Sequence, residues 1–185
     1  MRVRYMIASV VVLVAATATA TAAATPAFAA TVGSTPVTFS VTAGGLAITV
    51  PASANLGAGS PGTLLPAPLG VVQVVDQRAL LNASWTTTVS GTNFTTGTAT
   101  AAETVTTAFV DYWSGPAITN AGNGTFTPGQ ATAAQEQNLT TARVAFSMTA
   151  GTGNTSASWN PTVEVEIPAG AVFGTYNGTV THSVS

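Results

Sequence analysis

Side chains that could perform chemistry are few in this sequence, and they stand far apart. The 185 residues include a single histidine, His182, and neither cysteine nor lysine. A catalytic nucleophile needs a base within reach and a third group that orients that base. No nucleophile-elbow or comparable motif accompanies His182, which stands three residues before the last residue. We therefore expect no catalytic residue, no cofactor and no enzymatic activity.

The carboxylates suggest two further kinds of site, and each has a simpler explanation. Glu164 and Glu166 would project from one face of a strand, as a pair of glycosidase carboxylates does. They alternate with Val163, Val165 and Ile167, which favours a solvated outer face opposite an apolar one. One histidine and scattered carboxylates give no cluster with the spacing of a metal site, so we expect no bound metal.

Asp76 and Arg78 place two of the few charges two residues apart. On one strand they share a face and can form a salt bridge, which contributes only about 0–1 kcal/mol when it is exposed. A partly buried pair would instead fix the geometry of an adjoining loop. Direct contact with a ligand is the alternative, and we favour the structural role.

Aromatic residues are the strongest candidates for contact with a ligand. The rings of tryptophan and tyrosine present flat apolar area with a polar group, and they can stack on sugar rings. The candidates are Trp85, Trp113, Trp159, Tyr112 and Tyr176. A domain of this size also needs several aromatic anchors in its core. Trp85 would share a strand face with Val89, which favours the core for this residue.

These side chains must be positioned by strands, because helical periodicity is scarce. Threonine and valine are abundant and favour extended backbone, while glycine and proline interrupt the chain at short intervals. The pattern predicts a single all-β domain, an antiparallel β-sandwich with Greek-key-like connections. Strands are expected within 71–75, 85–90, 105–113, 142–148, 163–167 and 176–184.

The remaining segments are expected to connect these strands. Residues 37–42 and 46–50 predict a first hairpin around Gly44-Gly45. Loops are expected at 120–124 and 151–156, and one short helix within 129–138. The run at 71–75 predicts a strand buried on both faces. In the last strand, Tyr176, Val180, His182 and Val184 share what should be the inward face.

The N-terminus has the features of a secretory signal peptide. Arg2 and Arg4 precede an apolar stretch at 6–16, and an Ala-x-Ala cleavage site ends at Ala29. The apolar stretch is too short for a membrane helix, which needs about 20 residues. We therefore expect residues 1–29 to be removed and residues 30–185 to be exported, with no membrane insertion after processing.

Charge narrows the classes of partner. The expected mature segment has two arginines against six acidic residues, a net charge of −4. Nucleic-acid binding depends on neutralising phosphates with basic side chains, so we expect no nucleic-acid partner. A neutral-to-acidic, threonine-rich surface suits hydrogen bonding to glycan better than binding to anionic polymers.

Two segments together resemble the paired motifs of WxL domains. Asp76-Gln77-Arg78, Trp85-Thr86-Thr87 and Phe94 are similar to the proximal motif, and the last strand from Tyr176 to Val184 is similar to the distal one. The chain has Thr87 and two valines where the family has leucine, and His182 where the family has a second tryptophan. The resemblance covers roughly residues 71–185.

The resemblance implies a secreted β-rich domain that attaches noncovalently to the cell wall of Gram-positive bacteria through peptidoglycan. Its candidate binding residues are Asp76, Arg78, Trp85, Tyr176 and His182. The alternative is a structural, self-assembling or adhesive surface protein whose partner is another protein, because long strands with few edge charges have little to prevent edge-to-edge pairing.

Overall fold

The structure of this protein is a computed structural model that describes residues 34–185. The expected signal peptide, residues 1–29, lies outside the described residues. Residues 40–185 form one unit of antiparallel strands and three short 3-10 turns, which confirms the predicted all-β, sandwich-like fold. No helix within the described residues is long and apolar enough to cross a membrane.

Eleven strands make up the unit. They are β1 (Leu46–Thr49), β2 (Leu64–Pro68), β3 (Val72–Gly91), β4 (Phe94–Thr95), β5 (Thr104–Val105), β6 (Val110–Trp113), β7 (Ala117–Pro128), β8 (Gln137–Asn138), β9 (Arg143–Trp159), β10 (Thr162–Glu166) and β11 (Val180–Val184). The 3-10 turns are η1 (Ala101–Glu103), η2 (Thr107–Phe109) and η3 (Ala133–Gln135). One sheet has the order β1-β3-β9-β7, with β11 also paired to β3; a second has the order β2-β10-β6-β8; and β4 pairs with β5.

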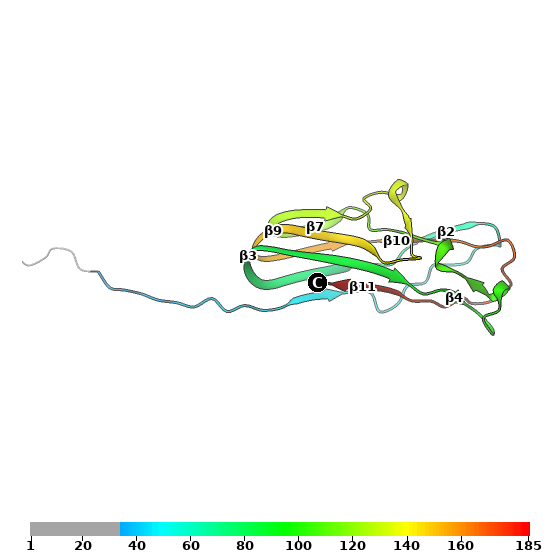
Figure 1. Ribbon diagram of the computed structural model, residues 1–185, viewed down its shortest axis with the longest axis horizontal. Coiled ribbons are helices and arrows are strands. Elements are labelled where there is room, and N and C mark those ends of the chain that lie inside the picture. The colour runs from blue at the N-terminus through cyan, green and yellow to red at the C-terminus, as the bar shows by residue number, and fades with distance from the viewer. Residues whose placement is uncertain (1–33) are drawn as a thin grey trace, which may run out of the picture. The chain divides into compact units, whose positions relative to one another are not determined.

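The three longest strands, β3, β7 and β9, bend sharply together at one end of the sheet (Figure 1). In β3 the guanidinium of Arg78 donates a hydrogen bond of 2.8 Å to the carbonyl of Ser84, although six residues of straight strand span about 20 Å. In β9 the rings of Phe146 and Trp159 stack with centroids 4.8 Å apart. Each strand therefore folds back on itself, and its two halves face each other across the core. We call this bend the arch.

Local backbone geometry explains the arch. Each long strand has two residues with positive φ at the bend: Ala79 and Asn82 in β3, Gly122 and Gly124 in β7, Ala150 and Gly153 in β9. The strand pairing shifts register at the same places, as it does at β-bulges, which bend a strand and increase its twist. The prediction that loops at 120–124 and 151–156 end strands is thus wrong, because β7 and β9 continue through these residues. Their glycine and asparagine residues mark bends within continuous pairing.

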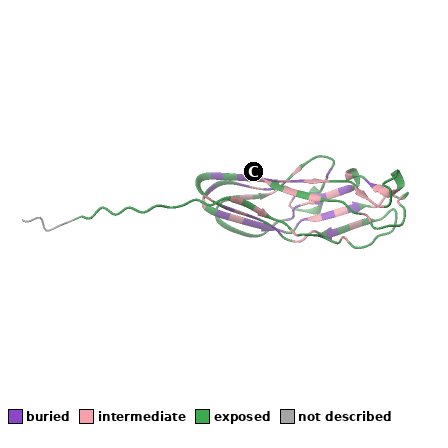
Figure 2. Ribbon diagram, turned by 90° about the horizontal axis from the view of Figure 1, so that it is seen from below, coloured by how far each residue is buried: buried purple, intermediate pink, exposed green. Residues whose placement is uncertain are grey.

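The core is built from the inner faces of these strands together with side chains of the second sheet, such as Tyr112 of β6 and Val163 of β10. Its largest fully buried side chains are Trp85, Trp159, Tyr112, Phe146 and Met148. Figure 2 shows buried positions alternating with exposed ones along the long strands. In β3, residues 85, 87 and 89 are buried while 86, 88 and 90 are partly exposed, which confirms the predicted alternation.

The predicted first hairpin is wrong. β1 pairs with β3, from Leu46 opposite Asp76 to Thr49 opposite Gln73, and residues 37–42 belong to no strand. Both glycines of the expected turn face one residue of β3: the Gly44 amide donates to the Gln77 carbonyl, and the Gly45 carbonyl accepts from the Gln77 amide. The two glycines therefore extend the pairing with β3 and do not reverse the chain.

Two other strand predictions need correction. The run at 71–75 is buried on one face, because Val72 and Val74 are inside whereas Val71 and Gln73 are exposed. The strand expected at 142–148 departs from the inward–outward alternation of a regular strand, because Thr87 pairs with Phe146 while Thr88 pairs with Val144. The intervening Ala145 is an extra residue, a bulge that turns Ala145 inward and leaves Val144 46% exposed.

The shorter segments also differ in part from expectation. The strand expected at 105–113 is divided by η2 into β5 and β6, and the helix expected within 129–138 is the single 3-10 turn η3. The alternation at 163–167 is confirmed, with Val163 and Val165 buried and Glu166 exposed. The last strand starts only at Val180, so Tyr176 lies in the irregular segment before it.

Candidate functional site

The five residues suggested by the motifs do not gather into one surface site. Among them, hydrogen bonds join only Asp76 and Arg78, at the arch. Trp85 is 1% exposed. His182 is in β11, and Tyr176 lines a groove together with Phe94 of β4. β4 lies at the end of the unit away from the arch (Figure 1). Each site residue therefore needs its own description.

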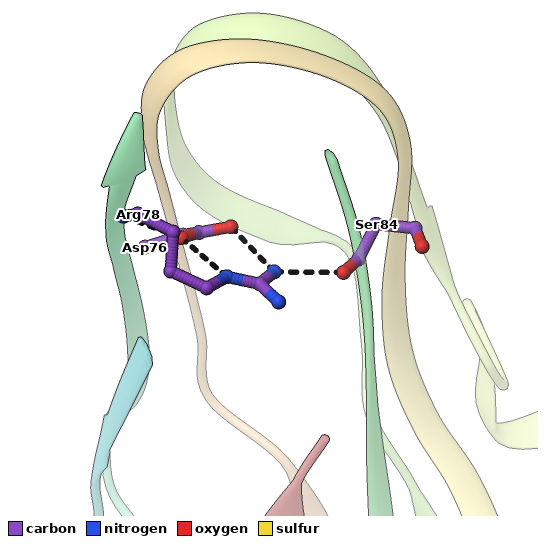
Figure 3. A network of polar contacts seen from close by, with 3 residues as sticks. All are labelled: Asp76, Arg78 and Ser84. Atoms are coloured by element: carbon purple, nitrogen blue, oxygen red, sulfur yellow. Dashed lines mark hydrogen bonds and ion pairs between the residues drawn. The ribbon is translucent and has the colours of Figure 1, made fainter. Parts of the chain in front are cut away.

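Asp76, Arg78 and the Ser84 carbonyl form a polar clamp across the β3 arch (Figure 3). The Arg78 guanidinium donates from Nε to Asp76 Oδ1 at 2.9 Å and from Nη2 to Oδ2 at 2.8 Å, and the same Nη2 donates to the Ser84 carbonyl. The Asp76 side chain is fully buried and that of Arg78 is 29% exposed. The hydrogen bonds from Arg78 hold the pKa of Asp76 below its ordinary value. This geometry connects the two arms of the arch.

Trp85 packs inside the sandwich and not on its surface. Its ring stacks on Phe146 with centroids 6.2 Å apart and forms a T-shaped contact with Phe126, with centroids 6.5 Å apart. The indole N–H has no hydrogen-bond partner among the described residues. A sugar ring could stack on Trp85 only if the core opened, so the contribution of this residue to any ligand site is indirect.

His182 belongs to an aromatic cluster with Tyr112 and Trp159. Its Nε2 lies 3.1 Å from the Tyr112 hydroxyl, and the two ring centroids are 5.6 Å apart. The Trp159 ring centroid is 6.5 Å from that of His182, in a T-shaped arrangement. Burial lowers the pKa of His182 to about 4, so its imidazole is neutral near pH 7. The predicted inward face is confirmed, since Val180, His182 and Val184 are partly buried while Thr181 and Ser183 are exposed.

A groove of about 650 Å³ lies at the end of the unit away from the arch. Two irregular segments, residues 54–61 and 171–178, border it, and it reaches inward to strand residues from β2, β4, β5 and β10. Its larger apolar side chains are Leu56, Leu65, Phe94, Val105, Val165, Ile167, Val172, Phe173 and Tyr176. No charged residue lines it. The volume is typical of ligand sites, which range from about 300 to 1,000 Å³. We call it the Tyr176 groove.

Hydrogen bonds fix the segment that contains Tyr176. The Tyr176 hydroxyl lies within donating distance of the carbonyls of Ala102 and Val172, at 3.1 and 3.0 Å. Asn177 exchanges backbone hydrogen bonds with Thr95 of β4. Phe173, in the same segment, is fully exposed.

Sequence reasoning identified Tyr176 but missed the groove. The apolar run Ala171-Val172-Phe173 between glycines was the one local signal of an unusual surface.

The carboxylates of β6 and β10 lie together on an outer sheet face. Asp111 is opposite Glu164 in register, and burial together with repulsion from Glu166 raises the pKa of Asp111. The pKa of Glu136 is raised by burial and by the charges of Glu164 and Asp111. Within residues 34–185 no group of three histidine or acidic side chains has an arrangement that could hold a metal ion.

No family model, curated protein or solved structure matches this chain.

Proposed function

We propose that this chain is a nonenzymatic structural protein of the cell surface that assembles with further copies of itself. The observation that carries the proposal is the segment 36–42. Val37, Phe39 and Val41 alternate with Thr38, Ser40 and Thr42, the pattern of a half-buried strand. The three apolar side chains are nevertheless 83%, 88% and 77% exposed. We call residues 36–42 the unpaired segment.

A segment with this pattern is suited to strand addition. An extended peptide that joins a partner gains backbone hydrogen bonds, and alternate side chains enter apolar pockets. Burying one exposed valine or phenylalanine side chain contributes about 1.5–3 kcal/mol. Three such side chains therefore offer a driving force that the isolated chain leaves unused.

The sheet edges offer little opposition to such association. Natural proteins protect edge strands with charged side chains, especially lysine, and with proline. β7 forms one edge of its sheet, has 12 residues and contains no charged side chain. β2 is different, because Pro66 and Pro68 interrupt its outer row of amides.

Light scattering after size-exclusion chromatography of the mature chain, over a wide range of concentrations, tests the proposal. We expect the mean mass to increase with concentration. Phe39→Ser should reduce the mass sharply, whereas Leu81→Ser, which removes another highly exposed side chain (77%), should not. A wild-type mass that stays monomeric at every concentration would reject assembly.

A second candidate function is noncovalent attachment to the cell wall. The WxL resemblance implies it, and the fully exposed Phe173 beside the uncharged Tyr176 groove favours it, because such a surface can stack on sugar rings. Pull-down with purified peptidoglycan and with whole Gram-positive cells tests this function. We expect binding that Phe173→Ser weakens and Leu81→Ser leaves unchanged. Absence of wild-type binding would remove this candidate.

A further inference from the structure

We propose that the Tyr176 groove of one copy receives the unpaired segment of a second copy. This inference rests on the proposed assembly and specifies its interface. The occupant is residues 36–42 in extended form, with Val37, Phe39 and Val41 directed into the groove.

The two surfaces match in chemistry. The occupant presents three apolar side chains, and the groove has unfilled volume beside Leu56, Phe94 and Ile167. Neither the groove lining nor the stretch from residue 5 to residue 75 contains a charged residue. Burying a charged group without a partner is strongly unfavourable. Insertion of the segment into the groove does not bury any charged group.

The border of the groove also has backbone groups available for pairing. Residues 54–59 belong to no strand, and the hydrogen bond recorded for their backbone amides is the local one from Gly57 to the Asn55 side chain. A Cβ added at Gly57 would meet no atom within 4 Å, so the space beside this residue is open. An extended segment lying along residues 54–59 can therefore form backbone hydrogen bonds as well as apolar contacts.

Chain length limits how far Phe39 can reach into the groove of its own chain. Gly44 is hydrogen-bonded to Gln77 at the arch, and Phe39 is five residues earlier, within about 18 Å of it at full extension. The groove residue Phe94 lies beyond the far end of β3, and the stretch from Ser84 to Gly91 alone spans about 23 Å. Phe39 therefore cannot reach the part of its own groove that Phe94 lines.

This arrangement joins unlike surfaces, the segment of one copy and the groove of the next. Such heterologous contacts close into rings, of which a dimer with reciprocal exchange is the smallest, or continue into open filaments. The inference therefore predicts linear or ring-shaped oligomers from a single kind of interface.

Mixing two variants of the mature chain tests the interface. Phe39→Ser keeps the groove and loses the inserting side chain, whereas Leu56→Glu keeps the segment and places a charge in the groove. We expect each variant alone to be monomeric and an equimolar mixture to form a 1:1 dimer that grows no further. Leu81→Glu, a matched charge at the arch, should assemble as the wild type does. Circular dichroism melting of each variant checks that it is folded.

Photo-crosslinking identifies the contact directly. A photoreactive phenylalanine analogue at position 39, in a mixture of isotopically light and heavy chains, should give light–heavy crosslinks to groove residues such as Leu56 and Phe94. Crosslinks to the β7 edge or within one chain would overturn the inference, as would wild-type-like assembly of Leu56→Glu.

If Leu56→Glu abolishes binding to peptidoglycan while assembly persists, the groove binds glycan, and the inference is also rejected. If the wild-type chain never assembles, the result would instead reject the proposed function, on which the inference about the interface rests.

Discussion

Asp76 and Arg78 show how a charge pair can serve an arch. The buried carboxylate receives both the side-chain and the backbone N–H groups of Arg78, and the same guanidinium reaches the Ser84 carbonyl on the opposite arm. A bidentate guanidinium is well suited to this task, because its planar fork fixes orientation as well as distance.

We predict that Arg78→Met lowers the free energy of unfolding by about 3 kcal/mol, because it leaves a buried carboxylate without its partner. Asp76→Asn combined with Arg78→Met should recover part of that loss. Arg78 holds the folded-state pKa of Asp76 below its ordinary value, so the stabilisation from the pair is present above the unfolded-state pKa, near 4, and disappears as pH falls through the folded-state value. Urea unfolding of the wild type and these two variants at pH 7 and pH 3 measures both effects. If wild type and Arg78→Met were equally stable at pH 7, the clamp would not stabilise the fold and the prediction would be wrong.

His182 acts over a different pH range. Burial lowers its folded-state pKa to about 4 from an ordinary value of 6.5, so only the unfolded chain takes up a proton between these values. Stability should therefore fall as pH decreases from about 6.5 to about 4, by roughly 3 kcal/mol in total. His182→Gln, which can still form a hydrogen bond with Tyr112 and does not titrate, should lose much less over this range. Unfolding curves of the wild type and His182→Gln at pH 7, 5.5 and 4.5 measure the difference. If the free energy of unfolding changed with pH by the same amount in both proteins, the prediction would be wrong.

At the scale of elements, β3, β7 and β9 bend through matched pairs of residues with positive φ. Glycine occupies three of these six positions, and Ala79, Asn82 and Ala150 occupy the others. A side chain with a Cβ is strained in this region, whereas glycine adopts it freely.

We predict that Ala79→Gly and Ala150→Gly each raise the free energy of unfolding by about 0.5–1 kcal/mol, because relief of strain exceeds the added chain entropy of glycine. Gly122→Ala should have the opposite sign, since a Cβ there would also press on the Asn154 carbonyl. Thermal unfolding of the three variants measures the changes. Destabilisation by both Ala→Gly changes would show that the arch does not hold these residues under strain.

At the scale of the whole molecule, the unpaired segment and the Tyr176 groove contain no charged residue, and this predicts how the proposed assembly responds to solvent. Contacts between charged surfaces weaken as salt screens them over a Debye length of about 8–10 Å. Apolar contacts instead strengthen in salts such as sulfate, which are excluded from the protein surface.

We therefore predict that assembly persists from about 10 to 500 mM sodium chloride and increases in ammonium sulfate. Sedimentation velocity at fixed protein concentration across these salts measures the response. Phe39→Ser serves as the control, because its mass should remain low in every dilute buffer. Dissociation of the wild type by sodium chloride would show that the interface is electrostatic and lies elsewhere.

The alternation of buried and exposed side chains along a strand could be predicted from the sequence, because successive side chains of a strand point to opposite faces. This period placed Trp85 and Val89 inside, separated Val163 from Glu166, and put His182 on the inward face of the last strand. The failures followed where a bulge shifts the period, as at Ala145, or where glycine marks a bend and not an end, as in β7 and β9.

Pairing partners and the groove were decided only by the tertiary structure. β1 had a plausible partner in residues 37–42, but it pairs with β3, because strand partners are chosen by contacts remote in sequence. The Tyr176 groove is built from residues 54–61 and 171–178, more than 100 positions apart, and no local pattern links them. The sequence by itself thus determined that the chain is built from strands, and the face that side chains such as Trp85, Val163 and His182 take. Which distant segments meet, and therefore where the groove lies, depended on the contacts between strands in the folded unit.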